Sequence, residues 1–366
     1  MSYRGPMSPY LNFYGGRQAI SVINDQGLSP QSVRVVAGAA GGPKWLVLGS
    51  MDKMLFSTWF AGRSKPLFLL GSSAGSWRFA AAAQKNPGQA LERLRQAYIE
   101  QWYSSRPSPR DITRECNRIF RRFLDPDGVA QILGNPVLRL NILAVRSLGP
   151  VGSETRSVQA AGLVAAAMAN AVKRDLLKFF FHRVLFYQSK DRPPFFGMNR
   201  FPIHHVPLSE ANIQKALLAS GSIPYVMEGV TGIPQAPPGV YRDGGALDYH
   251  LDIPFLENDL QGVVLFPHYT DRIIPGWLDK SLTRRLPGKA NMDPVLMICP
   301  SKKFLDLLPG KKIPDRNDFQ TFKGNNAERI RRWNKACGIS DLLAEELYNT
   351  LDSGRLREVV RPLPSA

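Results

Sequence analysis

Apolar runs and amphipathic segments alternate along much of this chain. Five short runs predict buried strands because they are mostly apolar and are bounded by turn-forming or polar residues. These runs cover residues 32–37, 66–70, 137–145, 262–266 and 295–299. Helical patterns separate several of them, which favours an α/β fold with a mainly parallel central sheet in a three-layer arrangement.

Two helices are predicted close to the first two strands. Apolar residues recur at nearly 3.6 per turn after the first run: Leu48, Met51, Leu55 and Trp59. Pro43 suits the first turn of such a helix, where its missing N–H costs nothing. An alanine-rich helix is predicted over 79–83, and the long stretch that follows it predicts inserted helices over about 80–200.

Two further segments bear on contact with a membrane. Residues 111–124 predict an amphipathic helix with an apolar stripe and an arginine-rich opposite face. Such a helix can lie on an anionic lipid surface, but a core-facing stripe with solvated arginines is the favoured interpretation. Residues 158–172 are alanine-rich and about fifteen long, too short to span a bilayer, and predict a buried helix.

The segment Gly71-Ser72-Ser73-Ala74-Gly75 follows one predicted strand directly and precedes a predicted helix. A G-x-S-x-G pattern in this context is typical of a nucleophile elbow, in which a sharp turn exposes the serine oxygen. The helix that begins there also favours nearby negative charge. The pattern arises by chance in many chains, so the strand–serine–helix context carries the prediction of Ser73 as a nucleophile.

A glycine-rich loop, Gly38 to Lys44, lies upstream between a predicted strand and a predicted helix. One interpretation is a tight turn of the kind found in any α/β protein. The other is an oxyanion hole, in which the N–H groups of Gly41 and Gly42 face a developing anion and Lys44 lies nearby. A nucleotide-binding loop is disfavoured because no G-K-[ST] sequence follows at the required spacing.

Asp243 is the best candidate for a base that activates the serine. It ends a short β-rich run and enters the Gly244-Gly245 turn, which places a carboxylate at a strand end with little crowding. Asp-Gly is also an ordinary turn dipeptide, and that interpretation stays open at this position.

The order of these elements resembles that of the patatin-like phospholipases, a family of lipid acyl hydrolases. The resemblance covers roughly residues 30 to 255 and includes Ala219-Ser220-Gly221-Ser222-Ile223-Pro224, which is similar to the family's A-S-x-x-x-P segment. It implies the patatin-like three-layer α/β/α fold and a Ser73–Asp243 dyad without histidine. It also implies an oxyanion hole formed by Gly41, Gly42 and Lys44. Four further glycines are implied to support the motifs: Gly71, Gly75, Gly244 and Gly245.

The chain departs from the family pattern at several positions. Ala39 and Ala40 interrupt the glycine run, and Ser76 follows Gly75 where a small apolar residue is usual. The Asn-x-Pro stretch that often follows the aspartate is replaced by residues 248–254. None of these changes removes a group that the dyad requires.

The resemblance implies hydrolysis of ester bonds in glycerolipids, phospholipids in particular, with no cofactor and no metal. Two alternatives stay open. One is another serine esterase or acyltransferase that uses a Ser-His-Asp triad, for which four histidines are candidates: His204, His205, His250 and His268. The other is a catalytically silent scaffold that binds lipid or protein.

The composition of the chain also indicates how it divides into domains and which partners its charge favours. We expect an N-terminal segment (1–29), a catalytic domain (30–270) and a basic extension (271–366) packed on it. The net charge of +17 makes an anionic membrane surface a candidate partner, while nucleic acid is disfavoured because no recognition motif is present.

The three cysteines form no metal or disulfide pattern and predict buried thiols: Cys116, Cys299 and Cys337. Without a signal-peptide pattern, the expected location is cytoplasmic, with peripheral contact at a membrane.

Overall fold

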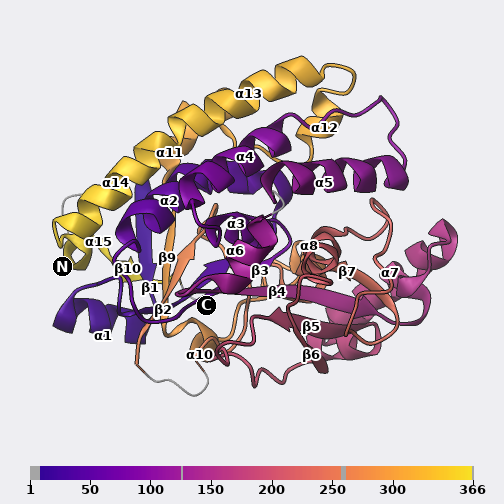
Figure 1. Ribbon diagram of the computed structural model, residues 1–366, viewed down its shortest axis with the longest axis horizontal. Coiled ribbons are helices and arrows are strands. Elements are labelled where there is room, and N and C mark those ends of the chain that lie inside the picture. The colour runs from indigo at the N-terminus through magenta and orange to yellow at the C-terminus, as the bar shows by residue number, and fades with distance from the viewer. Residues whose placement is uncertain (1–8, 125–126, 257–260, 365–366) are drawn as a thin grey trace.

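A ten-stranded, mostly parallel sheet runs through the centre of the protein, with helices packed on it (Figure 1). The computed structural model describes residues 9–124, 127–256 and 261–364. The strand order is β10-β1-β9-β8-β2-β3-β4-β5-β6, and β7 pairs with β4 outside this path. Neighbouring strands are parallel except in the pairs β1–β9, β4–β5 and β4–β7.

The strands have the following bounds: β1 Leu11–Gly15, β2 Val33–Gly38, β3 Leu67–Ser72, β4 Leu138–Ser147, β5 Phe181–Tyr187, β6 Ile203–Pro207, β7 Val240–Asp243, β8 Val263–Pro267, β9 Val295–Pro300 and β10 Arg361–Pro362. All five predicted strands are confirmed, as β2, β3, β4, β8 and β9. Strands β3 and β9 are buried along their whole length, as expected for strands covered on both faces.

The α-helices have the following bounds: α1 Arg17–Gln26, α2 Gly49–Met54, α3 Ala74–Ala82, α4 Pro87–Ile99, α5 Pro109–Phe123, α6 Gly128–Gly134, α7 Arg156–Val172, α8 Ile213–Gly221, α9 Gly245–Asp248, α10 Lys289–Met292, α11 Lys302–Leu307, α12 Asp318–Thr321, α13 Asn326–Ile339, α14 Asp341–Asp352 and α15 Leu356–Val359. The helix predicted near Pro43 forms as a 3₁₀ segment, Gly42–Leu48, that continues into α2.

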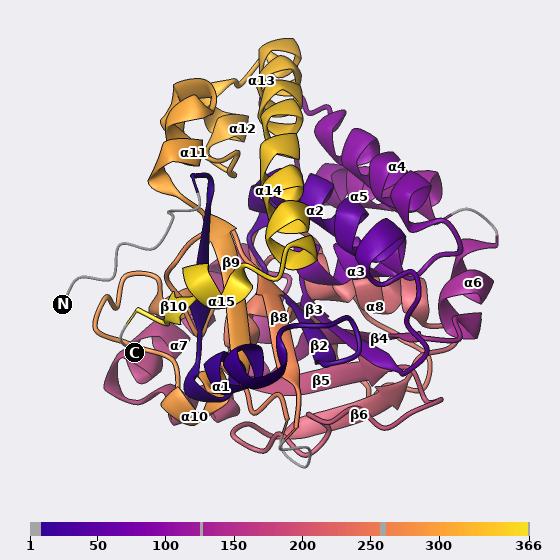
Figure 2. The ribbon, with the colours of Figure 1, turned by 90° about the vertical axis from the view of Figure 1, so that its left-hand side faces the viewer.

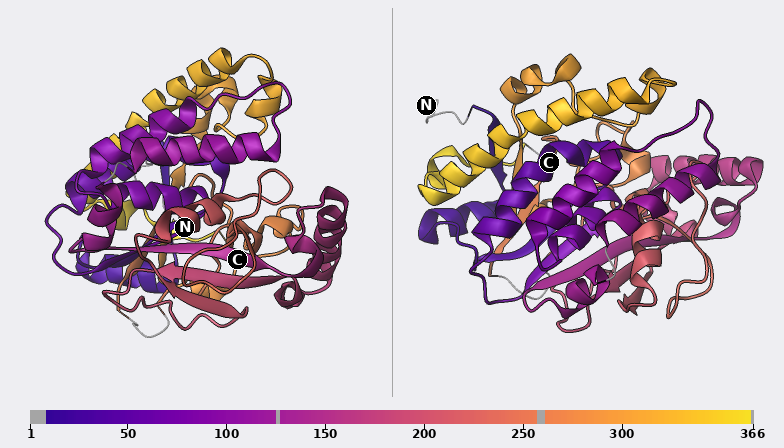
Figure 3. Two further views of the ribbon diagram at one scale, coloured as in Figure 1. Left: turned by 45° about the vertical axis from the view of Figure 1, so that its right-hand side comes forward. Right: turned by 45° about the horizontal axis from the view of Figure 1, so that its top comes forward.

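Helices α3 and α8 pack on the centre of the sheet, and α4 and α5 pack in turn on them. Helices α13 and α14 run end to end across this helical layer, beside α2 and α4 (Figure 2). The two views of Figure 3 show the same layer lying over the sheet and α13 and α14 crossing it. Helix α1 contacts β8 and β9.

The sheet draws strands from every part of the chain. Strand β1 lies within residues 1–29, while β9 and β10 lie within 271–366. The range of about 80–200, where inserted helices were expected, contains α4 to α7 and also β4 and β5 of the central sheet. Residues at both ends of the chain therefore help to form the same sheet.

The amphipathic helix expected at 111–124 is α5, and its apolar stripe faces the core, as the favoured interpretation predicted. Cys116, Ile119, Phe120 and Phe123 are buried. Arg122 on the other face forms an ion pair with Glu100.

The prediction of a buried helix over 158–172 is wrong. Helix α7 faces the rest of the protein with small and polar residues: Gln159, Gly162, Ala166 and Asn170. Several of its larger apolar side chains point outward, and Val164, Met168 and Val172 are 58%, 62% and 81% exposed. The helix is held through hydrogen bonds, such as that from Asn170 to Asp279, and through a small apolar contact made by Ala166 and Leu163. None of the helices in the described residues is long and apolar enough to cross a bilayer.

Candidate active site

Ser73 lies in a strained turn between β3 and α3. Its backbone has φ 54° and ψ −125°, a conformation that non-glycine residues rarely adopt. A Cβ atom added to Gly71 would lie 2.3 Å from the backbone nitrogen of Ser76, and one added to Gly75 would lie 2.0 Å from the carbonyl oxygen of Gly38. Both glycines of the motif are therefore required by close backbone packing around the serine.

Strand β4 brings Ser73 and Asp243 together. Strand β3 runs parallel to β4 and ends at Ser72, which is opposite Leu143. Strand β7 runs antiparallel to β4 and ends at Asp243, which is opposite Ala144. Since β5 occupies the other edge of β4, β3 and β7 share one edge and their carboxyl ends meet at neighbouring residues of β4.

The two side chains are hydrogen-bonded: Ser73 Oγ donates to Oδ2 of Asp243 at 2.7 Å. The other carboxylate oxygen, Oδ1, accepts the N–H of Gly245 at 2.7 Å, which orients the carboxylate. Ser73 is 4% and Asp243 6% exposed. Burial raises the pKa of Asp243, while the positive charge of Arg316 opposes that increase. A carboxylate with a raised pKa is a better base than an ordinary aspartate.

Ser220, on α8, holds the turn from a distant part of the chain. Its Oγ accepts the N–H of Ser73 at 2.9 Å and donates to the carbonyl oxygen of Leu143 at 2.6 Å. It thus links the serine turn to the point on β4 where β3 and β7 meet. The sequence marked Ser220 only as part of a family segment, since nothing local to it indicates a contact with Ser73.

The glycine-rich loop is fixed through Ala40. Its N–H donates to the carbonyl oxygen of Tyr249 at 2.9 Å, and its carbonyl oxygen accepts the hydroxyl of Tyr269 at 2.6 Å. The ring of Tyr269 also fills the space beside Gly41, where an added Cβ would lie within 2.8 Å of three of its atoms. Gly42 has a φ of 56°, which favours glycine.

The structure brings only part of the expected oxyanion hole beside the serine. Gly42 lines the same cavity as Ser73, whereas Gly41 and Lys44 are not among the residues that line it. In the part of the chain that the structure describes, the N–H groups of Gly41 and Gly42 donate no hydrogen bond. The Lys44 ammonium lies 5.0 Å from the centre of the Tyr269 ring, and burial lowers its pKa.

All five histidines lie in the described residues, and each has hydrogen-bond partners other than Ser73 and Asp243. His182 and His204 contact each other, and His205 contacts the carbonyl of Phe196. His250 Nε2 lies 2.7 Å from the Tyr269 hydroxyl, and its Nδ1 accepts the N–H of Ile274. His268 Nδ1 accepts the N–H of Thr270. Burial lowers the pKa of His268 to about 3 and that of His250 well below its ordinary value, which favours the neutral form of both rings.

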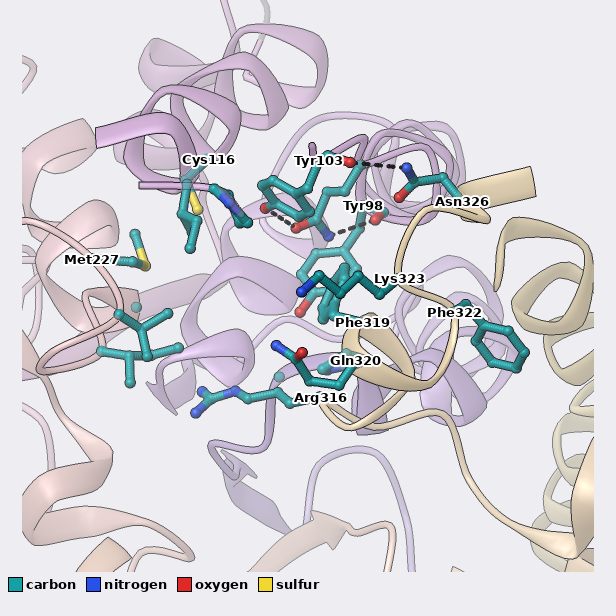
Figure 4. A pocket seen from close by; sticks show the side chains of 18 of the residues that line it. Tyr98, Tyr103, Cys116, Met227, Arg316, Phe319, Gln320, Phe322, Lys323 and Asn326 are labelled. Carbon is teal, nitrogen blue, oxygen red and sulfur yellow. Dashed lines mark hydrogen bonds between the residues drawn. The ribbon is translucent and has the colours of Figure 1, made fainter. Parts of the chain in front are cut away.

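A cavity of about 280 Å³ opens beside Ser73, between α5, α8 and the segment around α12 (Figure 4). Much of its lining is aromatic or aliphatic: Trp77, Tyr98, Ile112, Ile223, Val226, Met227, Phe319 and Phe322. Two cationic side chains, Arg316 and Lys323, also line it. Such a mainly apolar cavity beside a serine accommodates a hydrocarbon chain.

The three cysteines are buried and form no disulfide, as predicted. No cluster of three or more metal-ligating side chains occurs in residues 9–124, 127–256 and 261–364. A scan of protein-family models finds no match to this chain, and a search of curated proteins finds none either. Support for a function therefore comes from the geometry and chemistry of the site itself.

Proposed function

We propose that this protein is a serine acyl hydrolase of the patatin-like type, which cleaves fatty-acyl esters of glycerolipids through a Ser73–Asp243 dyad. The observation that supports this most directly is the 2.7 Å hydrogen bond between Ser73 Oγ and a buried carboxylate, formed at a strained strand–helix turn. A nucleophile held against its base in this way is what acyl transfer requires.

The reaction proceeds through an acyl-enzyme. Ser73 Oγ attacks the ester carbonyl carbon while its proton moves to Oδ2 of Asp243. The tetrahedral intermediate then collapses: the carbon–oxygen bond to the alcohol breaks, and the alcohol leaves with the proton from Asp243. Water repeats the sequence, giving its proton to Asp243 and releasing the fatty acid as Ser73 regains a proton.

The negative charge of the intermediate needs hydrogen-bond donors close to Ser73. The N–H of Ser73 is taken by Ser220 and is not available. Gly41 and Gly42 have N–H groups without acceptors in the described chain, and Gly42 lines the cavity. In this mechanism the N–H of Gly42 and the amino end of α3 supply the oxyanion hole, and the N–H of Gly41 lies next to it in the loop. Lys44 contributes a nearby positive charge.

The hydrogen bonds of the histidines favour a dyad over a triad. Neither His250 nor His268 is hydrogen-bonded to Ser73 or Asp243: His250 contacts Tyr269 and Ile274, and His268 contacts Thr270 through its Nδ1. His250 instead supports Tyr269, which holds the carbonyl of Ala40. We therefore assign His250 a structural role in the glycine loop.

An anionic membrane surface is the proposed source of the lipid. The exposed apolar side chains of α7 form an outward stripe together with Phe179, which follows the helix: Val158, Val164, Met168, Val172 and Phe179. Basic residues flank the stripe at Arg156, Lys173 and Lys178. An apolar stripe with basic flanks and a net charge of +17 matches the interface of a negatively charged bilayer.

This surface is connected to the cavity through Tyr225 and Val226. The N–H of Tyr225 donates to Gln159 on α7, and the guanidinium of Arg156 lies 5.1 Å from the centre of its ring. The neighbouring Val226 lines the cavity beside Ser73. A lipid that leaves a bilayer at α7 would therefore enter the cavity past these two residues.

An active-serine probe tests the proposed chemistry. A fluorophosphonate is expected to label the folded wild-type protein at Ser73, identified by peptide mass spectrometry, and to label neither Ser73→Ala nor Asp243→Asn. Ser222→Ala is the matched control and is expected to label normally, because its hydroxyl donates to Glu228 and not to the turn. A folded wild-type protein that is not labelled would favour the silent scaffold.

A further inference from the structure

Arg316 lies between the glycine loop and the dyad. A Cβ added to Gly42 would lie 3.0 Å from its Nε, so the guanidinium group packs directly on the loop. Arg316 lines the cavity that contains Ser73, and it also lines a second, smaller recess that contains Asp243. Figure 4 shows its side chain extending along the wall of the cavity.

Arg316 has no counter-ion in the described part of the chain, although it is half-buried. Its neighbour Asp315 forms an ion pair with Lys312. Four buried arginines are held by carboxylates, in these pairs: Arg78–Asp52, Arg174–Asp279, Arg183–Asp248 and Arg242–Glu154. Two others, Arg63 and Arg329, donate to backbone carbonyls instead. Among the described residues Arg316 has neither kind of partner, and it lies in the wall of the cavity beside the candidate nucleophile.

Two lysines add to the positive charge. The Lys280 side chain is exposed as a whole, but its ammonium lies 4.3 Å from the centre of the Tyr249 ring. Loss of water around that ammonium, together with repulsion by Arg316 and Lys44, lowers the pKa of Lys280 to about 8. Burial also lowers the pKa of Lys44, an effect that Asp315 opposes and Arg316 reinforces. Two carboxylates, Asp243 and Asp315, act on these three cationic side chains, so positive charge exceeds negative charge around the dyad.

We propose that Arg316 is the centre of an anion-binding subsite that receives the phosphate group of a phospholipid substrate beside the scissile ester. A guanidinium binds phosphate oxygens through two parallel N–H donors, and Lys280 and Lys44 strengthen the field there. The inference rests on the proposed function and narrows it: phosphate-bearing lipids are preferred over neutral acylglycerols of the same chain length.

Binding of two surfactants below their micelle concentrations tests the subsite without any turnover. In a Ser73→Ala background, decyl phosphate and decyl maltoside offer the same alkyl chain with a charged or a neutral head. Arg316→Gln is expected to weaken decyl phosphate binding by about 10-fold or more, since hydrogen bonds to charged groups are lost, and to leave decyl maltoside binding unchanged. Isothermal titration calorimetry measures both.

Arg331→Gln is the matched control, because Arg331 lies on α13 and is paired with Glu328 in solvent. It is expected to bind both probes as the parent does. The subsite would be ruled out if Arg316→Gln bound decyl phosphate normally, or if it lost both probes equally, which would mean that Arg316 only shapes the cavity. Because no ester is cleaved in this experiment, its result does not depend on whether the protein is a hydrolase.

Free inorganic phosphate separates the two sources of the anion. A phospholipid subsite predicts that the alkyl chain contributes to affinity, so phosphate alone displaces decyl phosphate only at far higher concentration. Displacement by phosphate at an equal concentration would instead indicate a site for the free anion, which would contradict the assignment to a lipid.

Discussion

Ser73 adopts a backbone conformation that is costly for a residue with a side chain, of order 1–3 kcal/mol, and the surrounding contacts maintain it. The glycines on each side allow the close packing of β2, β3 and α3, while Ser220 takes the Ser73 N–H. The same contacts leave the serine oxygen free to donate to Asp243. Strain at this residue therefore fixes the position of the hydroxyl group.

Ser220→Ala is expected to lower the catalytic rate and to destabilise the fold by about 1–3 kcal/mol, because the Ser73 N–H and the Leu143 carbonyl both lose a buried partner. Fatty-acid release and urea denaturation measure the two effects. Ser222→Ala, which removes a buried hydroxyl from the same segment, is expected to keep its rate. Equal loss of rate in both variants would mean that Ser220 has no special role in the turn.

The rate should depend on the ionisation of Asp243, which must be deprotonated to accept the serine proton. Since burial raises its pKa, kcat/KM is expected to rise with pH around a midpoint above the ordinary range for aspartate. Arg316→Gln removes a charge that lowers this pKa, so the midpoint should move to higher pH. A pH profile measures it with Arg331→Gln as control, and an unmoved midpoint would contradict the assignment.

Residues of the candidate site differ in how far the sequence could identify them. Ser73, Asp243 and Gly42 lie in glycine-marked turns, and the structure places them together. Arg316 and Ser220 reach the site from segments that carry no local signal, because their contacts depend on how distant elements pack. Lys44 lies next to the loop in sequence, but it packs against Tyr269 and does not line the cavity.

At the scale of elements, the site depends on two strands that meet end to end beside β4. Strand β3 could be predicted as an apolar run before the serine motif. Strand β7 has only four residues, Val240–Asp243, and its pairing with the far half of β4 is not visible in any local pattern. The short helix after it, α9, is held by an ion pair, in which Arg183 on β5 binds both carboxylate oxygens of Asp248 at 2.7 Å.

Asp248→Ala is expected to destabilise the protein by about 3–5 kcal/mol, because it leaves the buried guanidinium of Arg183 without a partner. Chemical denaturation measures the loss. Asp306→Ala removes a carboxylate from an exposed pair with Lys302 and should change stability by less than about 1 kcal/mol. If the two variants were equally stable, the buried pair would not hold the turn that carries Asp243.

Helix α7 shows where a pattern of hydrophobicity fails to predict burial. Its sequence is apolar enough to suggest a core helix, but small and polar residues form the face that packs on the protein. Gly162 allows close approach, since an added Cβ would lie 2.7 Å from the Val151 nitrogen. Leu163 packs inward beside this contact, while the other large apolar side chains of the helix are left exposed.

At the scale of the whole molecule, the net charge of +17 and the outward stripe of α7 predict binding to anionic vesicles. Met168→Asp should weaken this binding by about 10-fold or more, because it replaces a side chain whose burial contributes about 1.5–3 kcal/mol with a charge that the bilayer repels. Co-sedimentation with phosphatidylglycerol vesicles, in the Ser73→Ala background, measures it.

Leu307→Asp is the control for that experiment, since Leu307 is an exposed apolar residue on α11. It should bind vesicles as the parent does, and added salt should weaken binding in both. Unchanged binding by Met168→Asp would show that α7 is not the membrane surface. A change in oligomeric state on the same substitution would assign α7 to contact with a second copy of the chain.

The central claim, that the Ser73–Asp243 dyad hydrolyses lipid esters, is tested most directly by fatty-acid release from mixed anionic and zwitterionic vesicles. The wild-type protein is expected to release fatty acid, while Ser73→Ala and Asp243→Asn, each folded as judged by circular dichroism, are expected to release none above background. Activity that survives Ser73→Ala, or no release by the wild-type protein, would contradict the account.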